Sequence, residues 1–136
     1  PRLTARTPDG EELSTQPLRI AIGTSEVAAD ANIRGDNFRH IQTHDVEVAL
    51  ETMADMGLID VLVEGGPRLA SAFLEADAVD AIESYIAPAF LGAGLPVTSA
   101  NHETTITDIS RFRTVAVETL GDDILITALR SGKDRG

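Results

Sequence analysis

The sequence predicts an α/β fold built on a mixed, mostly parallel sheet with flanking helices and a C-terminal β-hairpin. Apolar segments of strand length alternate with segments of helical periodicity, and strands separated by helices favour parallel pairing with helices on the faces of the sheet. One such strand, at residues 59–63, leads through two glycines directly into a helix. Residues 112–119 and 123–129 flank a glycine turn, which predicts the hairpin and its antiparallel pairing.

The first half of the chain is predicted to hold two strands and one helix. Residues 18–23 are a short apolar run typical of a buried strand, and residues 38–43 are a weaker one. Asp45 suits the N-cap of a helix that extends to residue 56, and Gly57 suits its end. The apolar residues of this helix recur on one face: Val46, Ala49, Leu50 and Met53.

The second half begins with residues 59–63, which are aliphatic and β-branched and predict a buried strand. Residues 67–78 follow as a helix. Pro67 suits its first position because the fixed φ of proline fits a helix and the missing N–H would be unpaired there. Residues 80–87 alternate in polarity as a strand does, and residues 90–101, with two glycines and a proline, are predicted to be a loop.

Composition restricts the kinds of protein this chain can be. Its 136 residues suit one domain with a single core. It has no cysteine, and His40, His44 and His102 lack the spacing of metal ligands, so we expect no bound metal. The net charge of −11 opposes binding to nucleic acid or to anionic membranes. No apolar run reaches the ~20 residues that span a membrane, and no signal peptide is evident, so we expect a cytoplasmic protein.

The segment Glu64-Gly65-Gly66-Pro67 has two interpretations, and its Gly-Gly-Pro part by itself gives them equal weight. It can be a plain connection between a strand and a helix, with Glu64 in solvent, because glycines are ordinary turn formers. It can also be an anion site, because the N–H groups at a helix N-terminus attract negative charge. The carboxylate favours a ligand site slightly, since ligands of open α/β sheets bind at the carboxyl ends of strands.

Three stretches resemble the reductase domain of the bacterial bifunctional riboflavin-biosynthesis deaminase–reductase. The longest is VLVEGGPRLASAFLEADAVDAIESYIAPAFLGAG at residues 61–94, with the Glu-Gly-Gly-Pro turn, Val-Asp dipeptide and Tyr-Ile-Ala-Pro strand end typical of that family. PRLTAR at residues 1–6 and QPLRIAIGTS at residues 16–25 are the others, and all three occur in the family's order. The chain departs from the family at Arg68, where threonine is common, and at Gly23, where aspartate is common.

The resemblance implies a dihydrofolate-reductase-like fold, truncated at the N-terminus, and a homodimer. Residues 1–136 are then a partial reductase domain, because the family's domain has a strand and a helix before the PRLTAR motif and follows a zinc deaminase domain. We therefore expect a covalently linked deaminase domain in the parent protein. We also expect that the chain by itself binds NADPH weakly and turns over little or nothing.

The family's reaction, implied by the same resemblance, is the NADPH-dependent reduction of 5-amino-6-(5-phosphoribosylamino)uracil to 5-amino-6-(5-phosphoribitylamino)uracil. Leu3, Arg6 and Glu64 would contact this phosphorylated pyrimidine, with Glu64 the candidate catalytic residue. Arg6 suits a phosphate or a pyrimidine edge because a guanidinium donates in two places; the alternative is a surface arginine in a loop. The implied cofactor-binding residues are Thr24, Gly66, Pro67, Arg68, Leu69, Ala70, Ser71 and Ala72.

A second class of function stays open at this point. A chain without the first elements of its domain can be a non-catalytic module that keeps the fold and serves dimerisation or assembly. Oxidation of NADPH in the presence of the ribosylamino substrate distinguishes the reductase from such a module.

Overall fold

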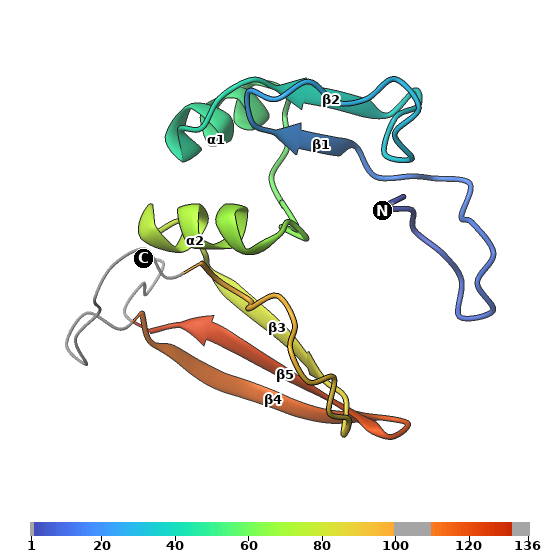
Figure 1. Cartoon of the computed structure of the whole chain (residues 1–136), viewed down its shortest axis with the longest axis vertical. Helices are drawn as coiled ribbons and strands as arrows, with labels where there is room; N and C mark the ends of the chain where they lie inside the picture. The colour runs from blue at the N-terminus through green and yellow to red at the C-terminus, as the bar shows by residue number, and fades with distance from the viewer. Residues whose placement is uncertain (1, 100–109, 132–136) are drawn as a thin grey trace. The chain divides into compact units, whose positions relative to one another are not determined.

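The computed structural model describes residues 2–99 and 110–131, which contain five strands and two helices. They divide into two compact units, Pro1–Val61 and Leu62–Gly136, and each unit is described by itself. Figure 1 shows the elements of each unit along the chain. The predicted α/β class is confirmed. The described strands form a parallel pair in the first unit and a separate antiparallel sheet in the second, instead of the single mixed, mostly parallel sheet that was expected.

The first unit is a parallel strand pair followed by a helix. Strand β1 (Arg19–Ile22) pairs in parallel with β2 (Phe38–Ile41), in a register that joins Arg19 to Phe38 and Ile22 to Ile41. Both strands lie inside the predicted ranges. The parallel pairing places the carboxyl ends of β1 and β2 at one edge, where α/β proteins bind ligands.

Helix α1 (Val46–Asp55) follows the sequence prediction at both ends. The Asp45 carboxylate accepts hydrogen bonds from the backbone N–H groups of Glu47 (2.9 Å) and Val48 (3.2 Å), which are the free donors of the first turn. At the other end Gly57 takes φ 78°, a left-handed conformation that costs glycine little. The buried core of this unit is Ile41, Val46, Ala49 and Met53.

The second unit places helix α2 (Pro67–Glu75) before a three-stranded antiparallel sheet of β3 (Ala81–Ile86), β4 (Phe112–Leu120) and β5 (Asp123–Arg130). The strand order is β3-β5-β4. Helix α2 ends earlier than residue 78 because Asp77 turns left-handed, with φ 56°. The N–H of Ala78 then bonds to the carbonyl of Phe73 at 3.0 Å and closes the helix end.

The predicted hairpin of β4 and β5 is confirmed. Leu120 pairs with Asp123, so only two residues form the loop, and Gly121 takes φ 64° as its first member. A glycine at that position suits the two-residue turns whose twist matches the strands. The ladder contains a register shift between Thr114 and Ala116, which leaves Val115 as an extra residue in β4.

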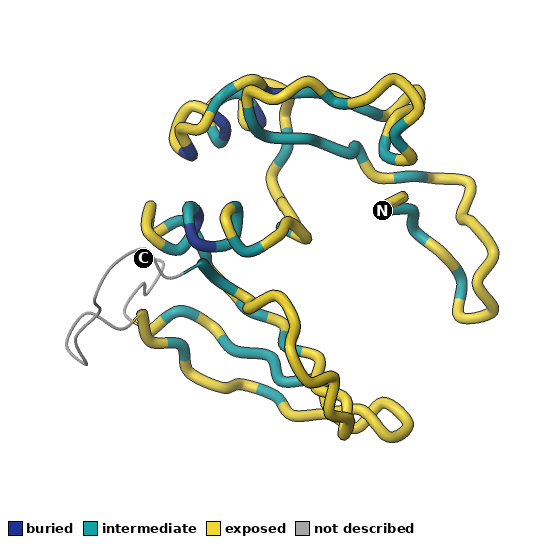
Figure 2. The backbone as a smooth tube through the Cα atoms, in the orientation of Figure 1, coloured by how far each residue is buried: buried dark blue, intermediate teal, exposed yellow. Residues whose placement is uncertain are grey.

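Arg130 joins the end of the sheet to the segment after α2. Its Nε donates to the carbonyl oxygen of Val79 at 2.7 Å, and its guanidinium pairs with Asp77 and lies 5.3 Å from the centre of the Phe112 ring. Buried residues are few in this unit, with Phe73 and Ser71 on α2 among the described ones (Figure 2). No described helix is both long enough and apolar enough to cross a bilayer.

The prediction of a buried strand at residues 59–63 is wrong for this structure. The segment has no regular structure, and Ile59 and Leu62 are 93% and 74% exposed. None of the described strands pairs with it, so its backbone groups have no ladder and its side chains have no sheet to cover. An apolar pattern predicts a buried strand only where neighbours are present to bury it.

Candidate functional site

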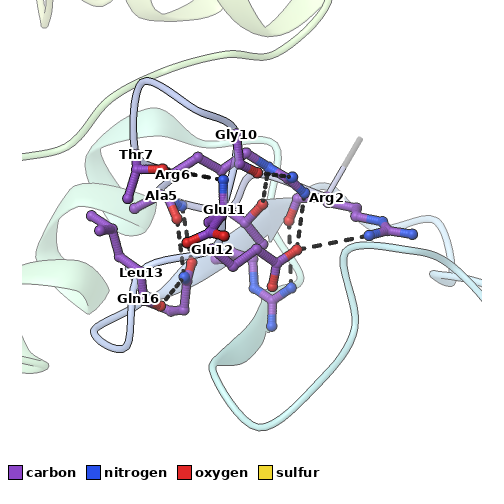
Figure 3. Close-up of polar contacts among 11 residues, drawn as sticks. Arg2, Ala5, Arg6, Thr7, Gly10, Glu11, Glu12, Leu13 and Gln16 are labelled. Carbon is purple, nitrogen blue, oxygen red and sulfur yellow. Dashed lines mark hydrogen bonds and ion pairs between the residues drawn. The ribbon is translucent and has the colours of Figure 1, made fainter.

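Arg6 lies in an N-terminal loop, residues 2–16, which is closed by its own hydrogen bonds (Figure 3). Arg6 and Glu12 form an isolated antiparallel bridge. The N–H of Thr7 donates to the carbonyl of Glu11 at 2.8 Å, and the turn between them places Gly10 at φ 86°. The chain therefore folds back at Pro8-Asp9-Gly10 and brings position 12 beside position 6.

Gln16 holds the two arms of this loop together through its side-chain amide. Its Nε2 donates to the carbonyl oxygens of Ala5 at 3.1 Å and Leu13 at 2.6 Å, and its Oε1 accepts from the N–H of Ala5 at 2.9 Å. The side-chain amide thus bonds to both the N–H and the carbonyl oxygen of Ala5, as the backbone of a neighbouring strand would. Arg19 of β1 also donates to the carbonyl oxygen of Arg2, at 3.4 Å.

All three nitrogens of the Arg6 guanidinium are engaged within the loop. The Nε donates to Oγ1 of Thr4 at 3.2 Å, one terminal nitrogen donates to the carbonyl of Gly10 at 2.8 Å, and the other pairs with Oε1 of Glu12 at 2.9 Å. Arg2 lies 3.7 Å from the same carboxylate oxygen. The Arg6 side chain is 41% exposed, so it is a surface arginine, but one that is held in place.

Leu3 and Thr24 are the other predicted site residues of the first unit. Leu3 is half-buried and takes φ 52°, a left-handed conformation that is rare for leucine. Thr24 is exposed just beyond the end of β1, and its Oγ1 lies 2.8 Å from Nε2 of His44. Thr24 and His44 therefore meet beyond the carboxyl ends of β1 and β2.

Glu64 and the start of helix α2 hold the predicted site residues of the second unit. Glu64 is exposed, and across the described residues no hydrogen bond or ion pair holds its carboxylate. Gly66 is the N-cap of α2 and provides no side-chain cap. The N–H groups of Leu69 (3.0 Å) and Ala70 (3.1 Å) bond to the carbonyl of Gly66, while Pro67 has no N–H to donate.

The two glycines before α2 have different surroundings. A Cβ atom on Gly65 would clash with the Leu69 side chain, lying 2.9 Å from the Cβ of Leu69. A Cβ atom on Gly66 would meet nothing within 4 Å. Gly65 is thus required by the packing of Leu69, whereas the space beside Gly66 is open at the helix N-terminus.

The predicted cofactor-binding residues on α2 are buried to different degrees. Arg68 is exposed, and Leu69, Ala70 and Ala72 are half-buried. Ser71 is only 7% exposed, and its hydroxyl bonds to Ser99.

The model of the RibD C-terminal domain family matches residues 1–126. The chain belongs to this family. The riboflavin biosynthesis protein RibD of Mycobacterium tuberculosis is 39% identical over 131 residues, which cover 93% of this chain and 38% of that protein. The RibD of Corynebacterium ammoniagenes is 41% identical over 100 residues, covering 71% of this chain and 29% of that protein.

Solved structures of RibD proteins share the fold. Acinetobacter baumannii RibD matches with a TM-score of 0.82 and 23% identity over 96% of this chain and 43% of that chain. A Thermotoga maritima deaminase/reductase matches with a TM-score of 0.71 and 22% identity over 96% of this chain and 41% of that chain. The fold is therefore the dihydrofolate-reductase-like fold of RibD reductase domains, and the chain spans about 38% of its Mycobacterium relative.

In this member of the RibD C-terminal domain family the predicted site residues fall into two groups. Leu3, Arg6 and Thr24 belong to the first unit, and Glu64 and residues 66–72 belong to the second. Sequence reasoning missed the contacts of Glu12, His44 and Ser99. The Pro-Asp-Gly turn was a usable signal for Glu12, and the position of His44 just after β2 was one for its contact with Thr24. Ser99 lies 28 positions from Ser71 and had no local signal.

The histidines form no metal site in the part of the chain that the structure describes, where no three potential ligands gather. The Nε2 of His40 donates to the carbonyl of Gly23 at 2.7 Å, and His44 contacts Thr24. His102 lies outside the described residues.

Proposed function

We propose that this chain supplies part of the site of an NADPH-dependent reductase that converts 5-amino-6-(5-phosphoribosylamino)uracil to its ribitylamino product. Membership of the RibD C-terminal domain family supports the proposal, as does the name of the Thermotoga maritima protein, which includes 5-amino-6-(5-phosphoribosylamino)uracil reductase. When bound, NADPH supplies the hydride that reduces C1 of the opened ribose, and the protein supplies position and electrostatics.

One observation carries the proposal: an unpartnered carboxylate directly precedes an open helix N-terminus. The first turn of α2 has no side-chain cap, and the space beside Gly66 is free. A pyrophosphate fits such a place because the helix dipole favours its charge. The N–H groups of Leu69 and Ala70 already bond to Gly66, so a phosphate oxygen would accept from the N–H of Arg68. Arg68 is exposed in the same turn and would add a cation. Residues 66–70 and Ala72 would therefore hold the NADPH pyrophosphate, whereas the buried Ser71 hydroxyl is already bonded to Ser99.

Glu64 would face the substrate. Its carboxylate can accept hydrogen bonds from ring N–H, amino or hydroxyl groups of the ribosylamino pyrimidine. Because no described group bonds to it, a substrate donor has no internal partner to displace. The same oxygens can hold a proton that is transferred during reduction, which is the catalytic role proposed for Glu64.

Arg6 would hold the substrate phosphate or a pyrimidine edge, with Leu3 beside it. The hydrogen bonds of the N-terminal loop fix the guanidinium, so little side-chain freedom is left to lose on binding. The Glu12 carboxylate now takes the place of an anion at Arg6. A phosphate would have to displace Glu12 or share the guanidinium with it.

Thr24 would bind the adenosine side of NADPH. Its hydroxyl can donate to a 2′-phosphate, and it lies beyond the carboxyl ends of two parallel strands. Residues 1–136 would form a partial reductase domain, with a covalently linked deaminase domain in the parent protein.

A homodimer, or an assembly module that has lost turnover, is the second candidate. Large apolar side chains are exposed on the three-stranded sheet, among them Tyr85 at 64% and Val117 at 62%. A surface of this kind favours contact with another protein surface. Assembly and reduction are compatible, and only turnover separates the enzyme from the module.

The test is an assay of the full-length protein with NADPH and the ribosylamino substrate. We expect one NADPH to be oxidised for each ribitylamino product formed, and no oxidation when the substrate is omitted. A folded, dimeric protein that oxidises no NADPH would support the assembly module. Equal use of NADH and NADPH would contradict the assigned cofactor.

A further inference from the structure

Ser71 is the buried polar residue of α2, and its hydroxyl is fully used. It donates to the carbonyl oxygen of Ser99 at 3.0 Å and accepts from the N–H of Ser99 at 2.9 Å. The Ser99 hydroxyl lies 3.3 Å away as a further donor. A serine hydroxyl has one donor and two acceptor sites, so these contacts leave it no free hydrogen-bonding site for a ligand.

The contact joins the first turns of α2 to the end of a long loop. The N–H of Ser99 also lies 3.4 Å from the carbonyl oxygen of Pro67, the first residue of the helix. Figure 1 shows the chain returning from the end of β3 to α2 along this loop. The large apolar side chains of the loop are almost fully exposed and so do not anchor it: Phe90, Leu91, Leu95 and Val97.

We infer that Ser71 is a positioning residue that fastens the loop of residues 87–99 to the helix start through the backbone of Ser99, and that it does not itself contact the cofactor. The inference rests on the proposed function in one respect: the first turn of α2 is taken as the binding place of the NADPH pyrophosphate. Loss of the fastening would release the loop beside that turn. Cofactor affinity would then fall indirectly.

The chain offers a matched pair of variants. Ser71→Ala removes all three contacts between Ser71 and Ser99 and leaves only the 3.4 Å contact of the Ser99 N–H with Pro67, whereas Ser99→Ala keeps both backbone bonds to Ser71 and loses only the 3.3 Å hydroxyl contact. In the full-length protein without cofactor, chymotryptic cleavage between Phe90 and Leu91 is followed by mass spectrometry. Ser71→Ala should raise the cleavage rate about tenfold, the scale expected when partly buried backbone groups lose their partners, and Ser99→Ala should leave it within about twofold.

Binding of NADPH separates the inference from a direct role of Ser71. The inference predicts that Ser71→Ala raises the NADPH dissociation constant together with loop cleavage, while kcat at saturating NADPH is retained. A higher dissociation constant with unchanged cleavage would overturn it and make Ser71 a ligand of the cofactor. Equal effects of the two serine variants would also overturn it.

A measurement on the unaltered protein covers the case in which Ser71→Ala fails to fold. Amide hydrogen exchange without cofactor should be slower at Ser99 than at Leu95, which has no bonded N–H among the described contacts. Equally fast exchange at both residues would overturn the fastening. Neither exchange nor cleavage requires NADPH to bind, so both test the fastening by itself. Failure of the proposed function would instead appear as a wild-type protein that does not bind NADPH.

Discussion

The two groups of candidate site residues differ in how their charges are partnered. In the first unit the Arg6 guanidinium bonds to Thr4, Gly10 and Glu12 within one short loop. In the second unit Glu64 is exposed and has no partner in the part of the chain described. The arginine is positioned locally and already neutralised, whereas the carboxylate is open to a ligand. A ligand must therefore compete with Glu12 for Arg6, whereas at Glu64 it competes with no described group of the protein.

The helix starts show the same contrast. The first turn of α1 is capped by the Asp45 carboxylate, while the first turn of α2 has no side-chain cap. Both helices are closed at their other ends by a residue with positive φ, Gly57 and Asp77. In α1 the Asp45 carboxylate already occupies the place that an anion would take, whereas in α2 no side-chain cap occupies it.

The largest effect is expected from Glu64→Gln in the full-length protein. Removal of a group that transfers a proton typically lowers the rate by about a hundredfold or more, so kcat/KM for the ribosylamino substrate should fall on that scale. Glu75→Gln, at the exposed end of α2, is the matched control and should change it less than about twofold, as for a substitution away from the site. Equal rates for Glu64→Gln and wild type would remove Glu64 from the site.

Gly65→Ala should have the next largest effect, and on stability. The added methyl group would clash with Leu69, and forcing an extra methyl group into packed surroundings costs about 1–3 kcal/mol. The free energy of unfolding in urea should fall by that amount. Gly66→Ala is the control, because its Cβ meets open space and its φ of −72° suits any residue. Equal losses in the two variants would contradict the distinction between the two glycines.

Gly66→Asp should weaken cofactor binding while preserving the fold. An aspartate at the N-cap would bond to the N–H groups of the first turn, as Asp45 does in α1. Its charge would then occupy the place proposed for the pyrophosphate. The NADPH dissociation constant should rise about tenfold, or ~1.4 kcal/mol, without loss of thermal stability. Unchanged affinity would place the cofactor elsewhere.

The sequence was sufficient to predict elements whose signals are local. The strands around Ile20 and Arg39, the Asp45 cap and the Gly121 hairpin were predicted because their signals are local: periodicity, a capping side chain and a turn glycine. Residues 59–63 were predicted wrongly, because burial of a strand depends on neighbours that a local pattern does not contain. The antiparallel order β3-β5-β4 depends on contacts between distant strands for the same reason.

The candidate site residues come from the resemblance, and their roles stay predictions. The structure adds how some of these side chains are held, such as Arg6 by Glu12 and Ser71 by Ser99. The Arg6 contact spans six residues and follows a turn signal, so it was within reach of sequence reasoning. The Ser71 contact spans 28 residues and was not.

The smallest effect is expected from Glu12→Gln. Removal of the carboxylate that pairs with Arg6 should free the guanidinium for a substrate phosphate. Exposed ion pairs contribute about 0.2–1 kcal/mol, so KM for the phosphorylated substrate should fall no more than about fivefold. Glu11→Gln, one residue away with no described side-chain bond, should leave KM unchanged. A higher KM for Glu12→Gln would show that Glu12 orients Arg6 instead of competing for it.

The central claim is that NADPH binds at the start of α2. The most direct test is the change in backbone amide NMR shifts of the isotope-labelled full-length protein on titration with NADPH. The largest changes should fall on Gly66, Arg68 and Leu69, and the hairpin residue Gly121 should not shift. Binding of NADPH with shifts that spare the first turn of α2 would contradict the claim.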